Sequence, residues 1–193
     1  MKYINHESYE DYVKQQTNTN KAKINNVWAV ESNMKDIKNY CDRYNIGVTN
    51  ILCHGTRNGA ELQYFHNNFP DIGILGTDIS DTATQFTNTV QWDFHDINND
   101  WIGQFDIVYT NSWDHAYDFE KALDVWMGQL TDTGRLFLDW NEDTSKPFNQ
   151  ADCCGCSKEE LIDLIEKKYV VESDGFAIEN RYGKEAYMIA VKK

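Results

Sequence analysis

The stretch 51–61 is the part of the chain whose residue types and spacing are best suited to chemistry. A short apolar run leads into Gly55 and Gly59, four positions apart, and apolar residues at helical spacing follow. This pattern predicts a strand, a tight turn and the start of a helix. Glycine allows a backbone to approach a ligand closely, and a helix start offers unpaired N–H groups, so such turns are typical of nucleotide sites. The same turn also occurs as a purely structural connection, and Arg57 stands where a strict G-x-G-x-x-G run has glycine.

Two acidic residues end later apolar runs of the chain. Asp78 lies roughly 20 residues after Gly55, the offset at which a Rossmann-type fold places an acid on ribose hydroxyls. Asp93 and Phe94 end the next apolar run. The Asp93 carboxylate could accept a hydrogen bond from an exocyclic amine, and the Phe94 ring could cover the base. Because parallel strands end at one edge of a sheet, the glycine turn and Asp78 together favour ligand binding over simple helix capping.

A histidine and an acid follow the apolar run 105–109. His115 is the one histidine beside an acid, Asp114, at the carboxyl end of a predicted central strand, where ligands of doubly wound sheets bind. We therefore select His115 as a candidate general base, with Asp114 beside it. The alternative is that His115 only caps or packs its helix. We interpret the other histidines without such a setting as surface or packing residues: His6, His66 and His95.

The overall composition predicts one folded domain and excludes some partners. The chain has 193 residues, 41% of them hydrophobic, which is enough for a sizeable core. Its formal net charge is −13 and it has no long basic run, so neither a nucleic acid nor an anionic membrane surface is expected as partner. A small molecule fits better, and the oligomeric state cannot be predicted.

Cysteine usage predicts a reducing, cytoplasmic location. The chain has five cysteines, an odd number, and neither a signal-like segment nor the ~20 consecutive apolar residues of a membrane span. The run 153–156 holds three of the cysteines but has no C-x-x-C partner pair, so we predict no metal cluster. We interpret it as a loop before a helix that begins with a capping box at Ser157.

The first 45 residues predict an N-terminal helical arm. Helical spacing is present at 8–16 and again from about Ser32, with a loop expected at 17–20 between them. We expect this arm to pack on the sheet or to cover the edge of a cleft, with Trp28 as an anchor in the packing.

Residues 48–193 predict a Rossmann-like core within the same single domain. Short apolar runs alternate with helical patterns, which implies a doubly wound, mostly parallel sheet with helices on both faces. We expect about seven strands. The turn 131–134 should end a helix, and two closing strands at 169–174 and 186–191 should pair antiparallel across the turn 180–184.

The order of these pieces resembles the class I S-adenosylmethionine-dependent methyltransferases, in particular the small type-11-like methyltransferase domain. Gly55 and Gly59 match the first and last glycines of the first motif of that family, and Asp78 matches its ribose acid. The remaining matches follow in the order of the family: Asp93-Phe94 for the adenine-contacting pair, 105–109 for the fourth strand, Asp114-His115 for a Glu-His pair, and 130–136 for an L-x-P-G-G-x-L run.

The resemblance implies an enzyme with S-adenosyl-L-methionine as cofactor and a small molecule as methyl acceptor. Methyl transfer would be an in-line displacement, in which holding the nucleophile about 3 Å from the methyl carbon matters most and a base is needed only for a protonated nucleophile. The implied cofactor-binding residues are His54, Gly55, Thr56, Arg57, Asn58, Gly59, Asp78, Ile79, Asp93, Phe94, Thr110 and Asn111.

Two departures from the family pattern leave alternatives open. Cys53 stands where the family usually has an acid and Arg57 where it has glycine, although His54 or Asn58 could supply replacement contacts. A non-catalytic methyltransferase-like binding or partner protein is therefore the second hypothesis. A nicotinamide oxidoreductase is a weaker third, because the full G-x-G-x-x-G is absent.

The end of the fifth predicted strand should face the acceptor pocket. Metal-dependent O-methyltransferases carry acids here, and Asp139 could act with Asp114 in that way. Trp140 stands where that group has asparagine, so we predict no metal. Trp113 and Trp140 could wall the pocket or pack in the core.

Overall fold

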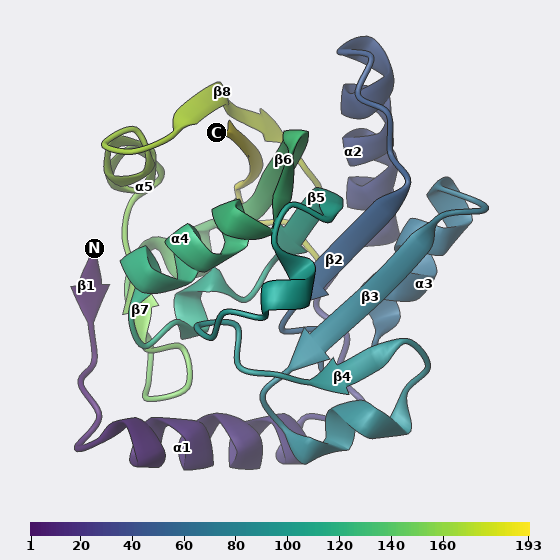
Figure 1. Cartoon of the computed structure of the whole chain (residues 1–193). Coiled ribbons are helices and arrows are strands. Elements are labelled where there is room, and N and C mark those ends of the chain that lie inside the picture. The colour runs from purple at the N-terminus through teal and green to yellow at the C-terminus, as the bar shows by residue number, and fades with distance from the viewer.

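A seven-stranded sheet forms the centre of the molecule (Figure 1). The computed structural model describes residues 1–193, apart from the side chain of Asp174. The strands lie in the order β4-β3-β2-β5-β6-β9-β8, and only the pairs that involve β9 are antiparallel. The expected Rossmann-like, mostly parallel sheet is thus confirmed. The strands are β2 (Asn50–His54), β3 (Gly73–Asp78), β4 (Thr89–Gln91), β5 (Phe105–Thr110), β6 (Leu130–Asn141), β8 (Val170–Ala177) and β9 (Ala186–Lys192).

Helices cover both faces of the sheet. The helices α2 (Glu31–Arg43) and α3 (Ala60–Asn68) pack on one face, and α4 (Phe119–Gln129) and α5 (Lys158–Ile165) pack on the other. Each face has its own hydrophobic cluster. Over the described residues, no helix has the length and apolar character that crossing a lipid bilayer requires.

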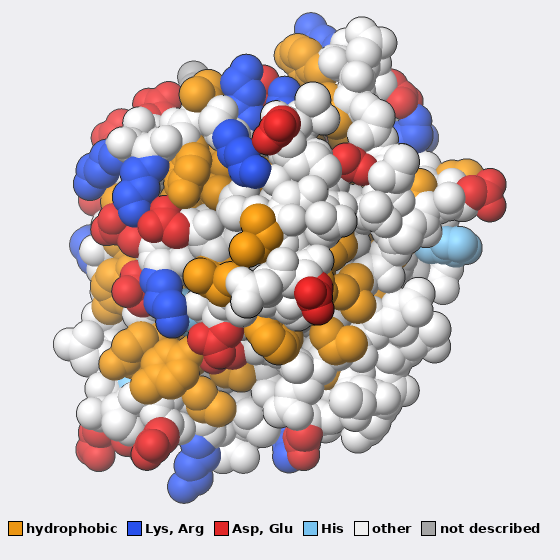
Figure 2. All heavy atoms as spheres, viewed as in Figure 1, with side chains coloured by type: hydrophobic (Ala, Val, Ile, Leu, Met, Phe, Trp, Pro, Cys, Tyr) orange, Lys and Arg blue, Asp and Glu red, His pale blue; other side chains and the backbone are white. Residues whose placement is uncertain are grey.

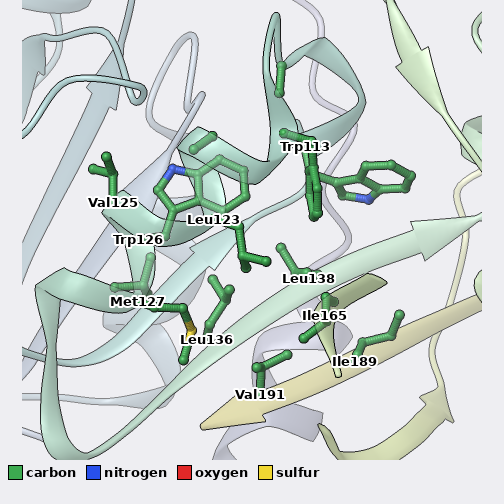
Figure 3. Packing of buried hydrophobic residues seen from close by; sticks show 14 of the residues in the cluster. Trp113, Leu123, Val125, Trp126, Met127, Leu136, Leu138, Ile165, Ile189 and Val191 are labelled. Carbon is green, nitrogen blue, oxygen red and sulfur yellow. The ribbon is translucent and has the colours of Figure 1, made fainter. Parts of the chain in front are cut away.

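Strand alternation divides the core between the two faces. Successive side chains of a strand point to opposite sides, so Leu136 and Leu138 face α4 and α5, whereas Phe137 between them faces α2 and α3. Figure 3 shows the cluster on the face of α4 and α5, in which Met127 of α4 lies near Leu136 of β6. Trp113, fully buried, donates its indole N–H to the Asp139 carbonyl oxygen at 2.9 Å.

The N-terminal helix α1 (Tyr9–Ala22) is longer than the sequence indicated. The loop expected at 17–20 was wrong, because these residues continue the helix. Ser8 accepts a hydrogen bond from the backbone N–H of Asp11 and so caps its start. Gln16 and Asn20, one turn apart on one side of the helix, are buried against the rest of the protein. In Figure 1, α1 runs below the ends of β3 and β4, so the arm covers the edge of the sheet.

Two further segments differ from expectation. Helix α4 ends at Gln129, and residues 131–134 lie within β6 instead of ending the helix. The register of β6 against β5 shifts here, and an added Cβ on Gly134 would stand 2.8 Å from the Phe105 carbonyl oxygen. The cysteine run includes the short strand β7 (Cys154–Gly155), which pairs with β1 (Lys2–Tyr3).

Candidate functional site

The turn between β2 and α3 has the tight geometry that its glycines predict. Gly55 and Gly59 adopt left-handed φ values of 73° and 72°. A Cβ on Gly55 would lie 2.6 Å from the Cβ of Ser112, so no larger residue fits there. Arg57 also takes a left-handed φ, 47°, and therefore keeps the turn at the position where the family has glycine.

Asp78 lies at the end of β3, directly beside this turn. Its carboxylate is buried and accepts the backbone N–H of Arg57 and that of Ser80, each at 2.9 Å. The side-chain amide of Asn20, from α1, donates to the same carboxylate. The structure thus brings the predicted ribose acid to the glycine turn, and α1 already holds one of its oxygens.

Asp93, after β4, is held by a histidine that the sequence analysis had set aside. His95 is buried and donates to Asp93 from its backbone N–H at 3.0 Å, and its Nδ1 lies 2.7 Å from the same oxygen. The hydroxyl of Tyr9, from α1, donates to the other oxygen. Burial opposes the charge of Asp93, but these hydrogen bonds outweigh it and lower the pKa of the carboxyl. The spacing Asp-x-His was the available signal.

Two cavities open at this edge of the sheet. The smaller has a volume of about 50 Å³ and lies between α1 and the strand ends, where its lining includes Asp78, Ile79, Asp93 and Phe94. The larger, of about 290 Å³, includes Thr56, Asn58, Asn111 and Asp114 in its lining. Both are lined by Gly55, Arg57, Ser112 and His115. Most of the predicted cofactor residues therefore gather around two adjoining spaces.

Three acids of the larger cavity carry perturbed carboxyl groups. Burial raises the pKa of Glu61 and of Asp139 to about 7, and that of Asp114 to about 6. The proximity of Asp114 to Asp139 adds to the effect at Asp139. Groups that titrate near neutral pH are common where proteins bind or transfer protons. In the sequence Glu61 is only a possible ion-pair partner of Arg57, because nothing in a helical pattern shows that an acid points inward.

The candidate base His115 lies in the turn η3 (Trp113–His115), between both cavities. Its Nδ1 is 2.8 Å from the Ala151 carbonyl oxygen, which can only accept, so Nδ1 carries a proton. Its Nε2 faces two acids, Asp152 at 3.5 Å and Asp114 at 3.9 Å. With Nδ1 protonated, Nε2 is the ring nitrogen that could take a proton. Asp152 beside it comes from a loop that sequence reasoning did not connect to His115.

The side chains around His115 could also bind a metal ion. Asp114, His115 and Asp152 each offer one ligand atom, and these atoms lie within 4.8 Å of one another. The pair that the sequence analysis weighed, Asp139 with Asp114, is therefore not the grouping that the structure forms.

Three predicted cofactor residues lie outside both cavities. His54 is buried, with Nδ1 at 2.8 Å from Thr77 Oγ1, Nε2 at 2.8 Å from Gln129 Oε1, and its ring stacked on Trp126. It shares the strand face of Leu52, which points to α4, so it is a core residue. Thr110 is likewise buried and accepts the N–H of Ser112 at 3.0 Å. Gly59 shapes the turn as the residue before α3 but is not among the lining residues of either cavity.

Of the tryptophans, Trp113 and Trp140 take the core alternative, and only Trp28 differs from the expectation. Trp113 and Trp140 are buried in the core, and neither is among the lining residues of a cavity. Trp28, expected as a packing anchor, is 41% exposed and lines the larger cavity. The guanidinium groups of Arg57 and Arg181 lie over its ring, with 5.4 and 5.9 Å between Cζ and the ring centroid.

Solved structures with the same fold place this edge of the sheet in context. The chain is similar to the Burkholderia thailandensis 1,6-didemethyltoxoflavin-N1-methyltransferase, crystallised with 1,6-didemethyltoxoflavin and S-adenosylhomocysteine, with a TM-score of 0.73 and 13% identity over 99% of this chain and 93% of that one. It is also similar to the plantazolicin methyltransferase BpumL, solved in complex with a triazolic desmethylPZN analog and SAH. The TM-score is 0.62, with 14% identity over 95% of this chain and 89% of that one. No protein-family model and no curated protein sequence matches the chain.

A third similar structure is a putative methyltransferase from Haloferax volcanii in complex with the Trm112 methyltransferase activator. It has a TM-score of 0.62 and 16% identity over 83% of this chain and 92% of that one. At these identities the likeness concerns the fold. The chain has the class I S-adenosylmethionine-dependent methyltransferase fold.

The residues at the strand ends fit the cofactor of this fold in kind and place. Asp78 and Asp93 are acceptors at the two expected positions, and Arg57 Nε and Glu61 Oε2 are buried without a hydrogen-bond partner among the described residues. The space under α1 is about 50 Å³, whereas pockets for drug-sized ligands have about 300–1,000 Å³. Side chains of α1 must therefore give way before a nucleoside can enter.

Proposed function

We propose that this protein is an S-adenosylmethionine-dependent methyltransferase that acts on a small-molecule acceptor. The observation that carries the proposal is the position of Asp78 and Asp93 beside the glycine turn, at the ends of adjacent parallel strands. Ligands of doubly wound sheets bind at this edge. Two carboxylates with ordered hydrogen-bond donors behind them suit the hydroxyls and the exocyclic amine of an adenine nucleoside.

Each lining residue then has a definite task. Asp78 would accept the ribose hydroxyls and Asp93 the adenine amine, while Ile79 and Phe94 cover the base. When bound, the cofactor supplies a methyl group on a sulfonium, which is an already activated leaving group. The protein contributes mainly by positioning, since the reaction is an in-line displacement.

The larger cavity is our proposed acceptor pocket. His115 lines this cavity, and with Nδ1 protonated its Nε2 is the nitrogen that would take a proton from a protonated nucleophile. Asp152 and Asp114 would stabilise the resulting imidazolium. The volume of about 290 Å³ supports a small acceptor, as does the sequence net charge of −13. On the face drawn in Figure 2, acidic and basic side chains are interspersed, which also does not favour a nucleic-acid partner. We further propose a single domain and a cytoplasmic location, which the five free, buried cysteines support.

Calorimetric titration with S-adenosylhomocysteine tests the proposal. We expect binding that Asp78→Asn weakens at least tenfold, because the isosteric change removes the charge and one acceptor oxygen. Asp71→Asn is the matched control, since Asp71 is exposed and has a left-handed φ of 66° that asparagine tolerates. Absence of binding in the unmodified protein would refute the proposed function.

A non-catalytic relative that keeps the fold is the second candidate. It is favoured by the hydrogen bonds from Asn20 and Tyr9, which occupy both carboxylates and make α1 a competitor of the cofactor. Incubation with methyl-labelled S-adenosylmethionine and fractionated small-molecule extracts separates the two. Cofactor binding without label transfer in any fraction would support the second candidate.

A further inference from the structure

The acid that the family pattern has at position 53 is absent here, and Glu61, in the first turn of the following helix, carries a carboxylate. Cys53 is buried, and after burial itself the charge of Glu61 is what raises the pKa of its thiol. The charge of the Glu61 carboxylate therefore reaches the Cys53 side chain, although Glu61 comes from the first turn of α3. A helix residue thus supplies a carboxylate to the cavity that Gly55 and Arg57 also line, whereas the strand residue at position 53 supplies none.

The Glu61 carboxylate is incompletely satisfied. Its side chain is 6% exposed and lines the larger cavity. Oε1 accepts a long hydrogen bond of 3.4 Å from Asn111 Nδ2. Oε2 is buried and has no hydrogen-bond partner among the described residues. A buried carboxylate oxygen without a donor is costly, so a donor from a ligand is the natural complement.

The Arg57 guanidinium is also incompletely satisfied, but here the atom without a partner is a donor on a cation. Its Nη1 lies 3.5 Å from the Asn26 carbonyl oxygen and its guanidinium lies over Trp28, which fixes the plane of the group. Nε is buried without a hydrogen-bond partner among the described residues. Although Asp78, Glu61 and Asp152 all contribute favourable charge, none of them forms an ion pair with it in the described part of the chain. The edge formed by Nε and Nη2 is the one that receives a carboxylate through two parallel hydrogen bonds.

We propose that Glu61 and Arg57 form the subsite for the amino-acid end of the cofactor, with Glu61 receiving the α-ammonium and Arg57 the α-carboxylate. This inference rests on the proposed function. A zwitterion offers one donor-rich cation and one acceptor-rich anion on the same carbon, which complements two buried groups of opposite charge that do not pair with each other. Gly55 lines both cavities, so this subsite adjoins the nucleoside position.

The subsite explains both departures from the family pattern together. Arg57 replaces a glycine yet preserves the left-handed turn, and it adds a cation on the cavity side. Glu61 supplies the acid that Cys53 lacks. The two changes are then linked: the acid moves from position 53 to Glu61, and position 57 gains a cation for the carboxylate of the ligand. Together they preserve cofactor binding.

The test is a calorimetric series with four ligands: S-adenosylhomocysteine, its analogue without the amino group, its analogue without the carboxyl group, and 5′-methylthioadenosine, which lacks both. For the unmodified protein we expect each missing group to weaken binding about tenfold, as is typical of a charged hydrogen bond. Glu61→Gln should abolish only the preference for the amino group. Arg57→Gly, which restores the glycine of the family and suits the left-handed turn, should abolish only the preference for the carboxyl group.

Each outcome decides the proposal. If the unmodified protein binds 5′-methylthioadenosine as tightly as S-adenosylhomocysteine, the subsite is refuted while the proposed function stands. If no adenosine ligand binds, both fall. If a variant weakens all four ligands equally, the residue only supports the fold and the subsite is refuted. The series on the unmodified protein remains decisive should Arg57→Gly fail to fold, and Asp71→Asn is the control that should leave all four affinities unchanged.

Discussion

Replacing Glu61 by glutamine should make the ligand-free protein more stable. The side chain is buried, and burial is the main reason that its carboxyl pKa rises from 4.5 to about 7. Arg57 and Asn111 lower this pKa and Asp78 raises it, but burial prevails. Glutamine keeps the shape of the side chain and an oxygen that can accept from Asn111, and it removes the charge.

The size and sign of the effect follow from the pKa. A shift from 4.5 to about 7, at about 1.4 kcal/mol per unit, gives about 3 kcal/mol. Because the folded protein binds this proton more tightly than the unfolded chain, the contribution of Glu61 to stability falls as pH rises from 4.5 to about 7 and is constant above. Glu61→Gln should therefore raise the free energy of unfolding by about 2 to 3 kcal/mol at pH 8, and by about 1 kcal/mol less at pH 6.

Urea unfolding at pH 8 and pH 6 measures both quantities. Glu166→Gln is the matched control, since Glu166 is exposed at the end of α5, and it should change stability by less than about 0.5 kcal/mol. The reasoning is refuted if Glu61→Gln is neutral or destabilising at pH 8, or if its effect is the same at both pH values. The gain should come with weaker binding of S-adenosylhomocysteine, as is common for residues that serve a ligand.

Three further changes test other parts of the site. Gly55→Ala should destabilise the protein by about 2 kcal/mol or more, because the new Cβ would lie 2.6 Å from the Cβ of Ser112 and the backbone φ is 73°. Gly47→Ala is the control and should be nearly neutral, because a Cβ there would have no atom within 4 Å. Chemical unfolding measures both free energies of unfolding. Asn20→Ala should tighten S-adenosylhomocysteine binding several-fold in calorimetry, since it frees an oxygen of Asp78, and unchanged affinity would count against competition by α1. His115→Gln should lower the methyl-transfer rate at least a hundredfold without weakening cofactor binding; equal loss in both would mean a structural role.

Local sequence patterns were sufficient for most of the fold. The alternation of apolar runs with helical spacing predicted the doubly wound sheet. Parallel strands are buried on both faces, so each strand is a short, nearly continuous run of hydrophobic residues that the local sequence shows. Gly55 and Asp78 could be placed at one site for the same reason: a left-handed turn requires glycine, and the ends of neighbouring parallel strands meet at one edge.

Patterns near element boundaries were less informative. Residues 17–20 are polar and looked like a loop, yet they continue α1, because burial of Asn20 against Asp78 outweighs weak helix propensity. His54 was expected at the cofactor site, but strand alternation turns it towards Trp126 in the core.

What the sequence by itself determined is the framework: the succession of strands and helices along the chain, the glycine turn, and the acids at the ends of β3 and β4. Only the tertiary structure decided what surrounds that framework. It placed α1 on the strand ends, His95 behind Asp93, Asp152 against His115, and the unpaired Glu61 and Arg57 on one cavity. Most of these contacts join segments that are far apart in the chain. Tertiary packing determines which residues meet, so the spacing of residues in the sequence does not predict the contacts.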